Sequence, residues 1–99
     1  MLKTTPFDPA DHLKTPESQA YLLEDAIASG DAAYIAHALG IIARARGMTG
    51  VAREAGVTRE ALYKALSPKG DPRLSTLLGV VHALGLRLAL VPDVANSKN

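Results

Sequence analysis

The chain has 99 residues, 47% of them hydrophobic, and a formal net charge of +1, which suits one domain with a single modest core. It contains no cysteine, and this excludes a disulfide scaffold and thiolate metal or redox chemistry. No segment is apolar for long enough to span a bilayer, and the N-terminus lacks the apolar run of a signal peptide. We therefore expect a cytoplasmic protein that is not bound to a membrane.

The charges are unevenly distributed. Residues 1–43 contain two basic and six acidic residues, a net charge of −4, whereas residues 44–73 contain seven basic and three acidic residues, a net charge of +4. Exposed charges are screened beyond about 10 Å, so the local charge matters more to an anionic partner than the total. The middle third is the candidate surface for nucleic acid.

The first two helices are expected over residues 16–29 and 32–46. Thr15 and Asp31 are suited to cap their N-termini, Pro16 suits a first helical position, and the glycines Gly30 and Gly47 follow their ends. With no tryptophan and a core of leucine, isoleucine, valine and alanine, the composition favours packed helices.

Two short helices should follow at residues 51–55 and 58–66, then a loop "SPKGDP", then a helix from residue 74 that ends at Gly85. Five helices are thus expected. Helical spacing predicts a buried face on the first, second and last of them, made by Leu22, Leu23, Ala26 and Ile27, by Ile35, Ala36, Leu39, Ile42 and Ala43, and by Leu74, Leu77, Leu78, Val81 and Leu84.

After Gly85 the period changes to that of a strand. Leu86, Leu88 and Leu90 alternate with other residues in "LRLALV". A single strand needs a partner for its backbone groups, so we expect it to pair with the same strand of a second subunit or with a strand of another protein. The expected organisation is a flexible arm (1–14), one domain (15–91) and a disordered tail (92–99).

The stretch "VAREAGVTREAL" has the residues that a sharp corner between two helices needs. Ala52 is small where the helices cross, Gly56 can adopt the left-handed conformation, Val57 packs the corner, and Thr58 caps the second helix. Helical hairpins that do not bind DNA share such residues. The exposed face of the second short helix must therefore show whether this corner is suited to DNA.

That face is suited to DNA. With Leu62 and Leu66 pointing inward, the start of the second short helix presents polar groups where a recognition helix enters the major groove. Arg59 can reach a guanine edge or a phosphate. The predicted DNA-binding residues are Thr49, Thr58, Arg59, Glu60, Tyr63, Lys64, Lys69 and Arg73. The alternatives are an ion pair between Glu60 and Lys64, and a Tyr63 that lies against the core.

No catalytic or metal site is evident. His12, His37 and His82 are scattered, and carboxylates never gather with a histidine or serine in a known constellation. We expect no cofactor and no enzymatic activity.

The stretch "VAREAGVTREALYKAL" is similar to the XRE-type helix-turn-helix of phage repressors. The longer run "IARARGMTGVAREAGVTREALYKALSPKGDPRLSTLLGVVHALGLRL" resembles the probable addiction-module antidote family. The resemblance implies an all-α, five-helix, lambda-repressor-like domain that forms a homodimer, binds operator DNA in its own promoter and pairs with a RelE-type toxin. Gly50 stands where XRE-type domains often have glutamine, so the first short helix offers only Thr49 and its backbone, for phosphate.

These patterns together indicate a transcriptional repressor and antitoxin. The alternative from another class is a protein-interaction adaptor with a repressor-like fold, whose strand at residues 86–91 joins a partner's sheet.

Overall fold

The computed structural model describes residues 15–93. Within this range the chain forms α2 (Pro16–Ser29), α3 (Ala32–Arg46), α4 (Met48–Ala55), α5 (Arg59–Ala65) and α6 (Leu74–Ala83). The predicted all-helical class and the order of the five helices are confirmed. The predicted arm (1–14) and residues 94–99 of the predicted tail lie outside the described residues.

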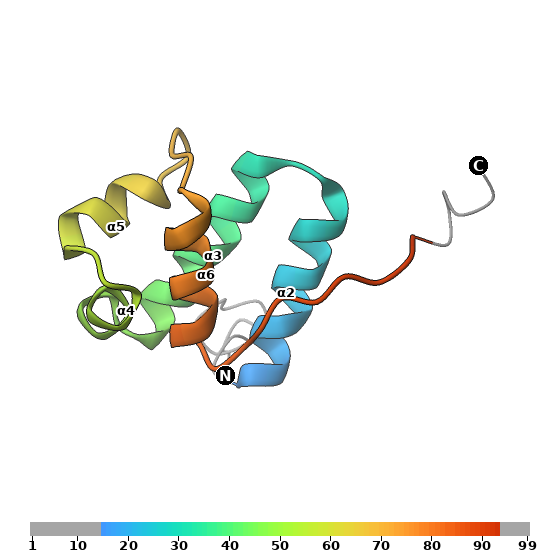
Figure 1. Ribbon diagram of the computed structural model, residues 1–99, viewed down its shortest axis with the longest axis horizontal. Coiled ribbons are helices and arrows are strands. Elements are labelled where there is room, and N and C mark those ends of the chain that lie inside the picture. The colour runs from blue at the N-terminus through green and yellow to red at the C-terminus, as the bar shows by residue number, and fades with distance from the viewer. Residues whose placement is uncertain (1–14, 94–99) are drawn as a thin grey trace, which may run out of the picture.

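The helices α2 and α3 form an antiparallel hairpin, while α4 and α5 lie on the opposite side of the molecule (Figure 1). Helix α6 packs mainly on α4, and α4 also contacts α3 and α5. The two short helices thus lie far from α2, with the rest of the core between them. No helix in the described range is long and apolar enough to cross a membrane.

The predicted helix ends are confirmed in α2 and α3. The Thr15 hydroxyl oxygen accepts a hydrogen bond from the Ser18 N–H at 3.1 Å, and the Asp31 carboxylate accepts one from the Ala33 N–H at 3.0 Å. Gly30 ends α2 in the left-handed conformation, with φ +70°. These caps fix the tight turn that folds α3 back along α2.

The core is aliphatic, as the composition predicts. Its largest completely buried apolar side chains are Leu39, Ile42, Leu62, Val80 and Leu84, which come from α3, α5, and the end of α6. Each side chain of this size contributes about 1.5–3 kcal/mol when buried. Leu62 therefore holds the middle of α5 to the body.

The prediction of buried faces is wrong at three residues. Ile27 on α2 and Leu74 and Leu78 on α6 are exposed, whereas the predicted Leu77, Val81 and Leu84 are partly or completely buried and Val80 is buried beside them. Helix α6 is apolar around most of its circumference, so spacing alone could not choose between Leu78 and Val80 for its inner face. The choice depends on Gly79, where an added Cβ would lie 3.1 Å from the Ala55 backbone, so α4 packs directly on this side of α6.

One polar side chain is buried among residues 15–93. Gln19 on α2 is completely buried, and its side-chain oxygen accepts a hydrogen bond of 2.9 Å from Arg46 at the end of α3. The same Arg46 nitrogen donates to the Leu84 carbonyl at 3.1 Å. Arg46 thus links α2, α3 and the end of α6.

Residues 86–93 leave α6 as an extended segment. Gly85 ends the helix with φ +77°, as predicted, and the chain then runs beside α2 (Figure 1). No β-strand is present within residues 15–93. The predicted strand needs the backbone of a second chain, so it stays a prediction.

Candidate nucleic-acid interface

The corner between α4 and α5 has the geometry that its sequence predicts. Gly56 ends α4 with φ +77°, and the Val57 N–H donates back to the Ala52 carbonyl at 3.0 Å. The Thr58 hydroxyl oxygen then accepts from the Ala61 N–H at 3.0 Å and caps α5. Ala52 is buried, so its small side chain allows the close crossing of the helices.

Helix α4 starts earlier than predicted. It begins at Met48 instead of Val51, because the Gly47 carbonyl already accepts from the Val51 N–H at 3.1 Å. Met48 is buried and holds the first turn to the core, while Thr49 is exposed beside it. Gly50 faces open space, since an added Cβ would meet no atom within 4 Å.

Helix α5 divides into an inner and an outer face. Leu62 and Leu66 are buried, as predicted, while the outer face presents exposed Arg59, Glu60 and Lys64. All basic residues of the segment 44–73 are exposed: Arg44, Arg46, Arg53, Arg59, Lys64, Lys69 and Arg73. The basic third of the sequence therefore has its charged residues on the outside of the fold, although Arg46 also donates to Gln19 and to the Leu84 carbonyl.

Tyr63 lies between two arginines. The Arg59 guanidinium carbon is 5.5 Å from the centre of the Tyr63 ring, and that of Arg44 is 5.9 Å from it, both within the range of a cation–π interaction. Arg59 also makes a long hydrogen bond of 3.5 Å to the Tyr63 hydroxyl, which raises the pKa of Arg59, with a smaller effect from Glu60. Tyr63 is 37% exposed, so it is part of the surface and not of the core.

Arg44 is the residue that sequence reasoning missed. It lies on α3, outside the two short helices, and nothing in the spacing of the chain indicates that it meets α5. Glu60 and Lys64 form no ion pair with each other in the described part of the chain, so the predicted alternative for these two residues is absent.

Lys69 and Arg73 are presented by the loop after α5. The Gly70 N–H donates to the Ser67 carbonyl at 2.8 Å, and a Cβ on Gly70 would overlap the Ala65 carbonyl, so a side chain has no room there. The loop is thereby pressed against the end of α5. It leaves both basic side chains exposed, and Arg73 immediately precedes α6.

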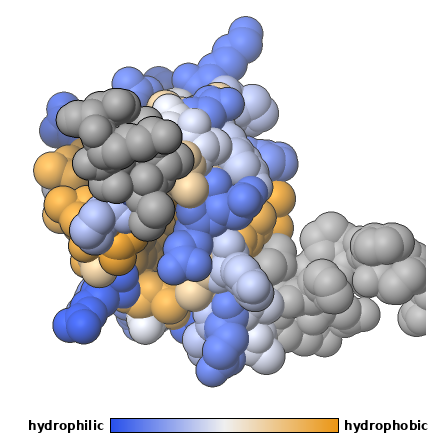
Figure 2. Space-filling model, turned by 90° about the vertical axis from the view of Figure 1, so that its right-hand side faces the viewer, coloured by the Kyte–Doolittle hydropathy of each residue, from blue (hydrophilic) through white to orange (hydrophobic). Residues whose placement is uncertain are grey.

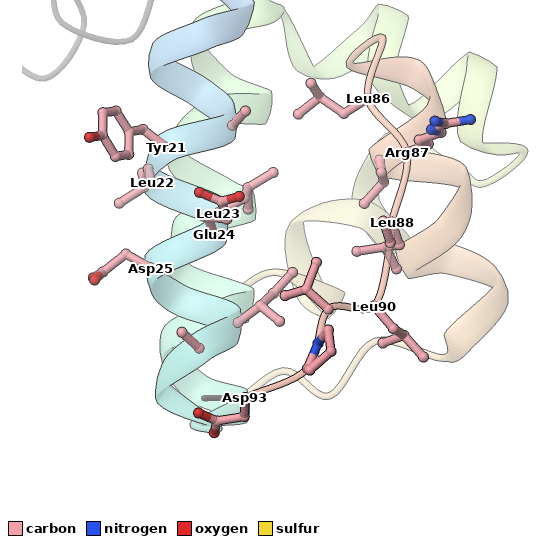
Figure 3. A pocket seen from close by; sticks show the side chains of 17 residues that line it. Tyr21, Leu22, Leu23, Glu24, Asp25, Leu86, Arg87, Leu88, Leu90 and Asp93 are labelled. Carbon is pink, nitrogen blue, oxygen red and sulfur yellow. The ribbon is translucent and has the colours of Figure 1, made fainter. Parts of the chain in front are cut away.

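A second surface lies on the other side of the molecule. An open, largely apolar groove of about 1180 Å³ separates α2 from the segment 86–93, and Figure 3 shows Leu86 pointing from that segment toward α2. Figure 2 shows exposed apolar residues among charged ones on this side. Of the predicted dimerisation residues, Leu86 is half-buried against the core, whereas Leu88 is 40% and Leu90 fully exposed.

No group of three metal-binding side chains is found among residues 15–93. The features that the described fold offers to a partner are therefore the basic corner and the apolar groove.

The sequence profile of a family described as probable addiction module antidote protein matches residues 3–92, almost the whole chain. The chain belongs to this family. An uncharacterised protein of Haemophilus influenzae is similar to this antidote protein, with 44% identity over 81 residues that cover 82% of this chain and 84% of the relative. No solved structure matches the antidote protein significantly. Membership supports an antitoxin role, which implies a cognate toxin as partner.

Proposed function

We propose that this antidote protein is a cytoplasmic, sequence-specific repressor of its own operon that also neutralises a RelE-type toxin, with no enzymatic activity of its own. The observation that carries the DNA-binding part is the corner of α4 and α5. Its cap, turn and buried leucines hold the outer face of α5 rigidly on the basic side of the molecule. We infer that this corner is an XRE-type helix-turn-helix in a lambda-repressor-like domain, in which the second helix enters the major groove.

In this proposal the first turn of α5 enters the major groove. Arg59 contacts a guanine edge, for which its planar guanidinium provides two parallel donors. Thr58 uses its oxygen to cap α5, and its hydroxyl proton is left to donate to a phosphate. Tyr63, Glu60 and Lys64 complete the surface that faces the bases.

The flanking residues hold the DNA backbone. Thr49 lies at the exposed start of α4, and Lys69 and Arg73 lie on the loop that is pressed against α5. Contacts to phosphate position a protein on DNA without selecting a sequence. Replacing Lys69 by alanine should therefore lower affinity about equally for all duplexes, whereas Arg59→Ala should lower the preference for the operator.

The proposal includes a homodimer. The extended segment 86–91 has the alternation of a strand. Its Leu86 N–H donates to the Val81 carbonyl at 3.1 Å, and the residues after it could pair with their copies about a two-fold axis. Two corners would then contact half-sites about 34 Å apart in a palindrome.

The toxin is proposed to bind the acidic N-terminal half. Two acidic residues there also have structural roles, because Asp31 caps α3 and Asp25 accepts a hydrogen bond from Tyr34. Glu17 and Glu24 are exposed and make no such hydrogen bond within the described residues, and only Glu17, in the first turn of α2, also favours the helix dipole. Their reversal to lysine is therefore the cleaner test. These changes should weaken neutralisation of the neighbouring toxin gene and leave repression intact.

The function is tested in cells with a reporter driven by the region upstream of the gene, together with growth after induction of the adjacent toxin gene. The full chain should repress the reporter and restore growth. Arg59→Ala should restore growth but lose repression, because only the DNA contact is changed. A chain that restores growth and never represses would support an antitoxin without operator binding.

A second candidate function is the adaptor that binds a protein and not DNA. It is favoured by the apolar groove beside an extended segment whose Leu90 and Val91 are 101% and 80% exposed. A strand added by a partner would use this edge in the same way as a second copy. Absence of DNA binding at low salt would favour this adaptor.

A further inference from the structure

Arg44 of α3 is a basic residue outside the two short helices whose guanidinium carbon lies 5.9 Å from the centre of the Tyr63 ring on α5. It is exposed, and it forms no ion pair with a carboxylate in the described residues. Its one recorded side-chain interaction is with the ring of Tyr63.

The position of Arg44 depends on Gly40, one turn earlier in α3. A Cβ on Gly40 would lie 3.4 Å from an Arg44 guanidinium nitrogen and 3.1 Å from the Leu66 carbonyl oxygen. The missing side chain therefore lets the end of α5 approach α3. It also leaves the space across which Arg44 extends toward Tyr63.

The Tyr63 ring is shared by two cations. Arg44 approaches it from α3 and Arg59 approaches it from the start of α5. A guanidinium that stacks on a ring loses side-chain freedom but keeps its N–H groups for an acceptor. Two like charges at one exposed ring repel each other, and an anion between or beside them would relieve this repulsion.

We propose that Arg44 is a DNA-backbone contact outside the two-helix corner, and that Tyr63 is the platform that positions both Arg44 and Arg59. Arg44 contacts a phosphate where α3 meets α5, and Arg59 is left to contact a base edge. This inference rests on the proposed DNA-binding function and adds a residue that the helix-turn-helix pattern does not contain.

The experiment measures binding of the full-length protein to the upstream duplex and to a scrambled duplex by fluorescence anisotropy at several salt concentrations. Arg44→Gln should weaken binding to both duplexes, about tenfold each, because a phosphate contact carries no sequence information. The slope of log affinity against log salt concentration should become less steep by about one for each Arg44 that contacts a phosphate. Ala33→Glu is the matched control, since it lowers the net charge by the same amount at the other end of α3.

The role of Tyr63 is tested by two substitutions. Tyr63→Phe keeps the ring and should bind close to the wild type, whereas Tyr63→Leu should weaken binding. Because Tyr63 positions Arg44, Arg44→Gln should have a smaller effect once Tyr63 is replaced. The double variant Arg44→Gln/Tyr63→Leu should bind the duplexes less tightly than Tyr63→Leu alone, but by clearly less than tenfold. Thermal melting confirms that each variant is folded.

Wild-type affinity and an unchanged salt slope for Arg44→Gln would overturn the inference and leave the proposed function standing. An equal effect of Ala33→Glu would also overturn it, because the loss would then come from net charge. If the wild-type chain binds neither duplex at low salt, the proposed function itself fails.

Discussion

The Arg46 side chain has a structural role that its position in the sequence does not indicate. It belongs to the basic third of the chain, yet it donates to the buried Gln19 and to the Leu84 carbonyl. Removing a donor from buried acceptors costs about 1–3 kcal/mol.

Arg46→Met should therefore lower the free energy of unfolding by about 1–3 kcal/mol, measured by chemical denaturation. Arg53→Met is the matched control, because Arg53 is exposed on α4 and should change stability by less than about 0.5 kcal/mol. Equal effects of the two substitutions would show that Arg46 is an ordinary surface residue.

The hydrogen bond between Tyr34 and Asp25 makes a second prediction for single residues. Tyr34 donates to the Asp25 carboxylate at 2.7 Å, and this bond raises the pKa of Tyr34 above 10.0 because it requires the proton. The folded chain thus holds this proton more tightly than the unfolded chain does. The contribution to stability is complete below pH 10 and is lost as the pH rises through the raised pKa.

The wild type should therefore be more stable than Tyr34→Phe near neutral pH, and the difference should shrink as the pH rises above 10.0. Thermal melts of both proteins over this range provide the measurement. A difference that stays constant up to about pH 11 would contradict the assigned bond.

At the scale of the helices, the contact of α6 with α4 determines where the corner lies. Gly79 leaves no room for a larger side chain, because an added Cβ would lie 3.2 Å from the Ala55 Cβ. Gly79→Val should push α4 away and destabilise the fold by about 1–3 kcal/mol.

Gly50 provides the opposite case on α4. It faces open space, so Gly50→Ala should stabilise the protein by about 0.5–1 kcal/mol through helix propensity alone. The denaturation midpoints of Gly79→Val and Gly50→Ala, each compared with the wild type, test these two predictions. A stable Gly79→Val variant would show that the close crossing of α4 and α6 is not required.

Local signals predicted the helices well. Thr15, Asp31, Gly30 and Thr58 are caps that act on their own neighbours, so their roles could be inferred from the sequence and are confirmed. The inner face of α6 was predicted only in part, at Leu77, Val81 and Leu84. Apolar residues surround that helix, and the tertiary contact at Gly79 buries Val80 and leaves Leu74 and Leu78 exposed.

The candidate site was likewise predicted only in part. The buried Leu62 and Leu66 and the exposed Arg59 follow from the period of α5 and were predicted. The contact of Arg44 with Tyr63 joins two residues on different helices that are 19 positions apart in the chain. No local pattern records such a contact.

For the whole molecule, the proposed homodimer depends on the segment 86–91. Proline at position 88 removes a backbone donor from a paired strand. Leu88→Pro should therefore give a monomer by light scattering, with the helical circular dichroism unchanged because the segment lies outside the helices. Leu88→Val keeps the donor and should remain a dimer, and a monomeric wild type would contradict the proposed pairing.

The central claim is that the basic corner binds operator DNA. The most direct test is the affinity of the wild-type chain for a duplex from its own upstream region, measured by fluorescence anisotropy from low to physiological salt. Phosphate contacts by two subunits predict specific binding that weakens steeply, with a log–log slope of roughly −5 or steeper. No binding at low salt, or equal binding to a scrambled duplex of the same composition, would contradict the account.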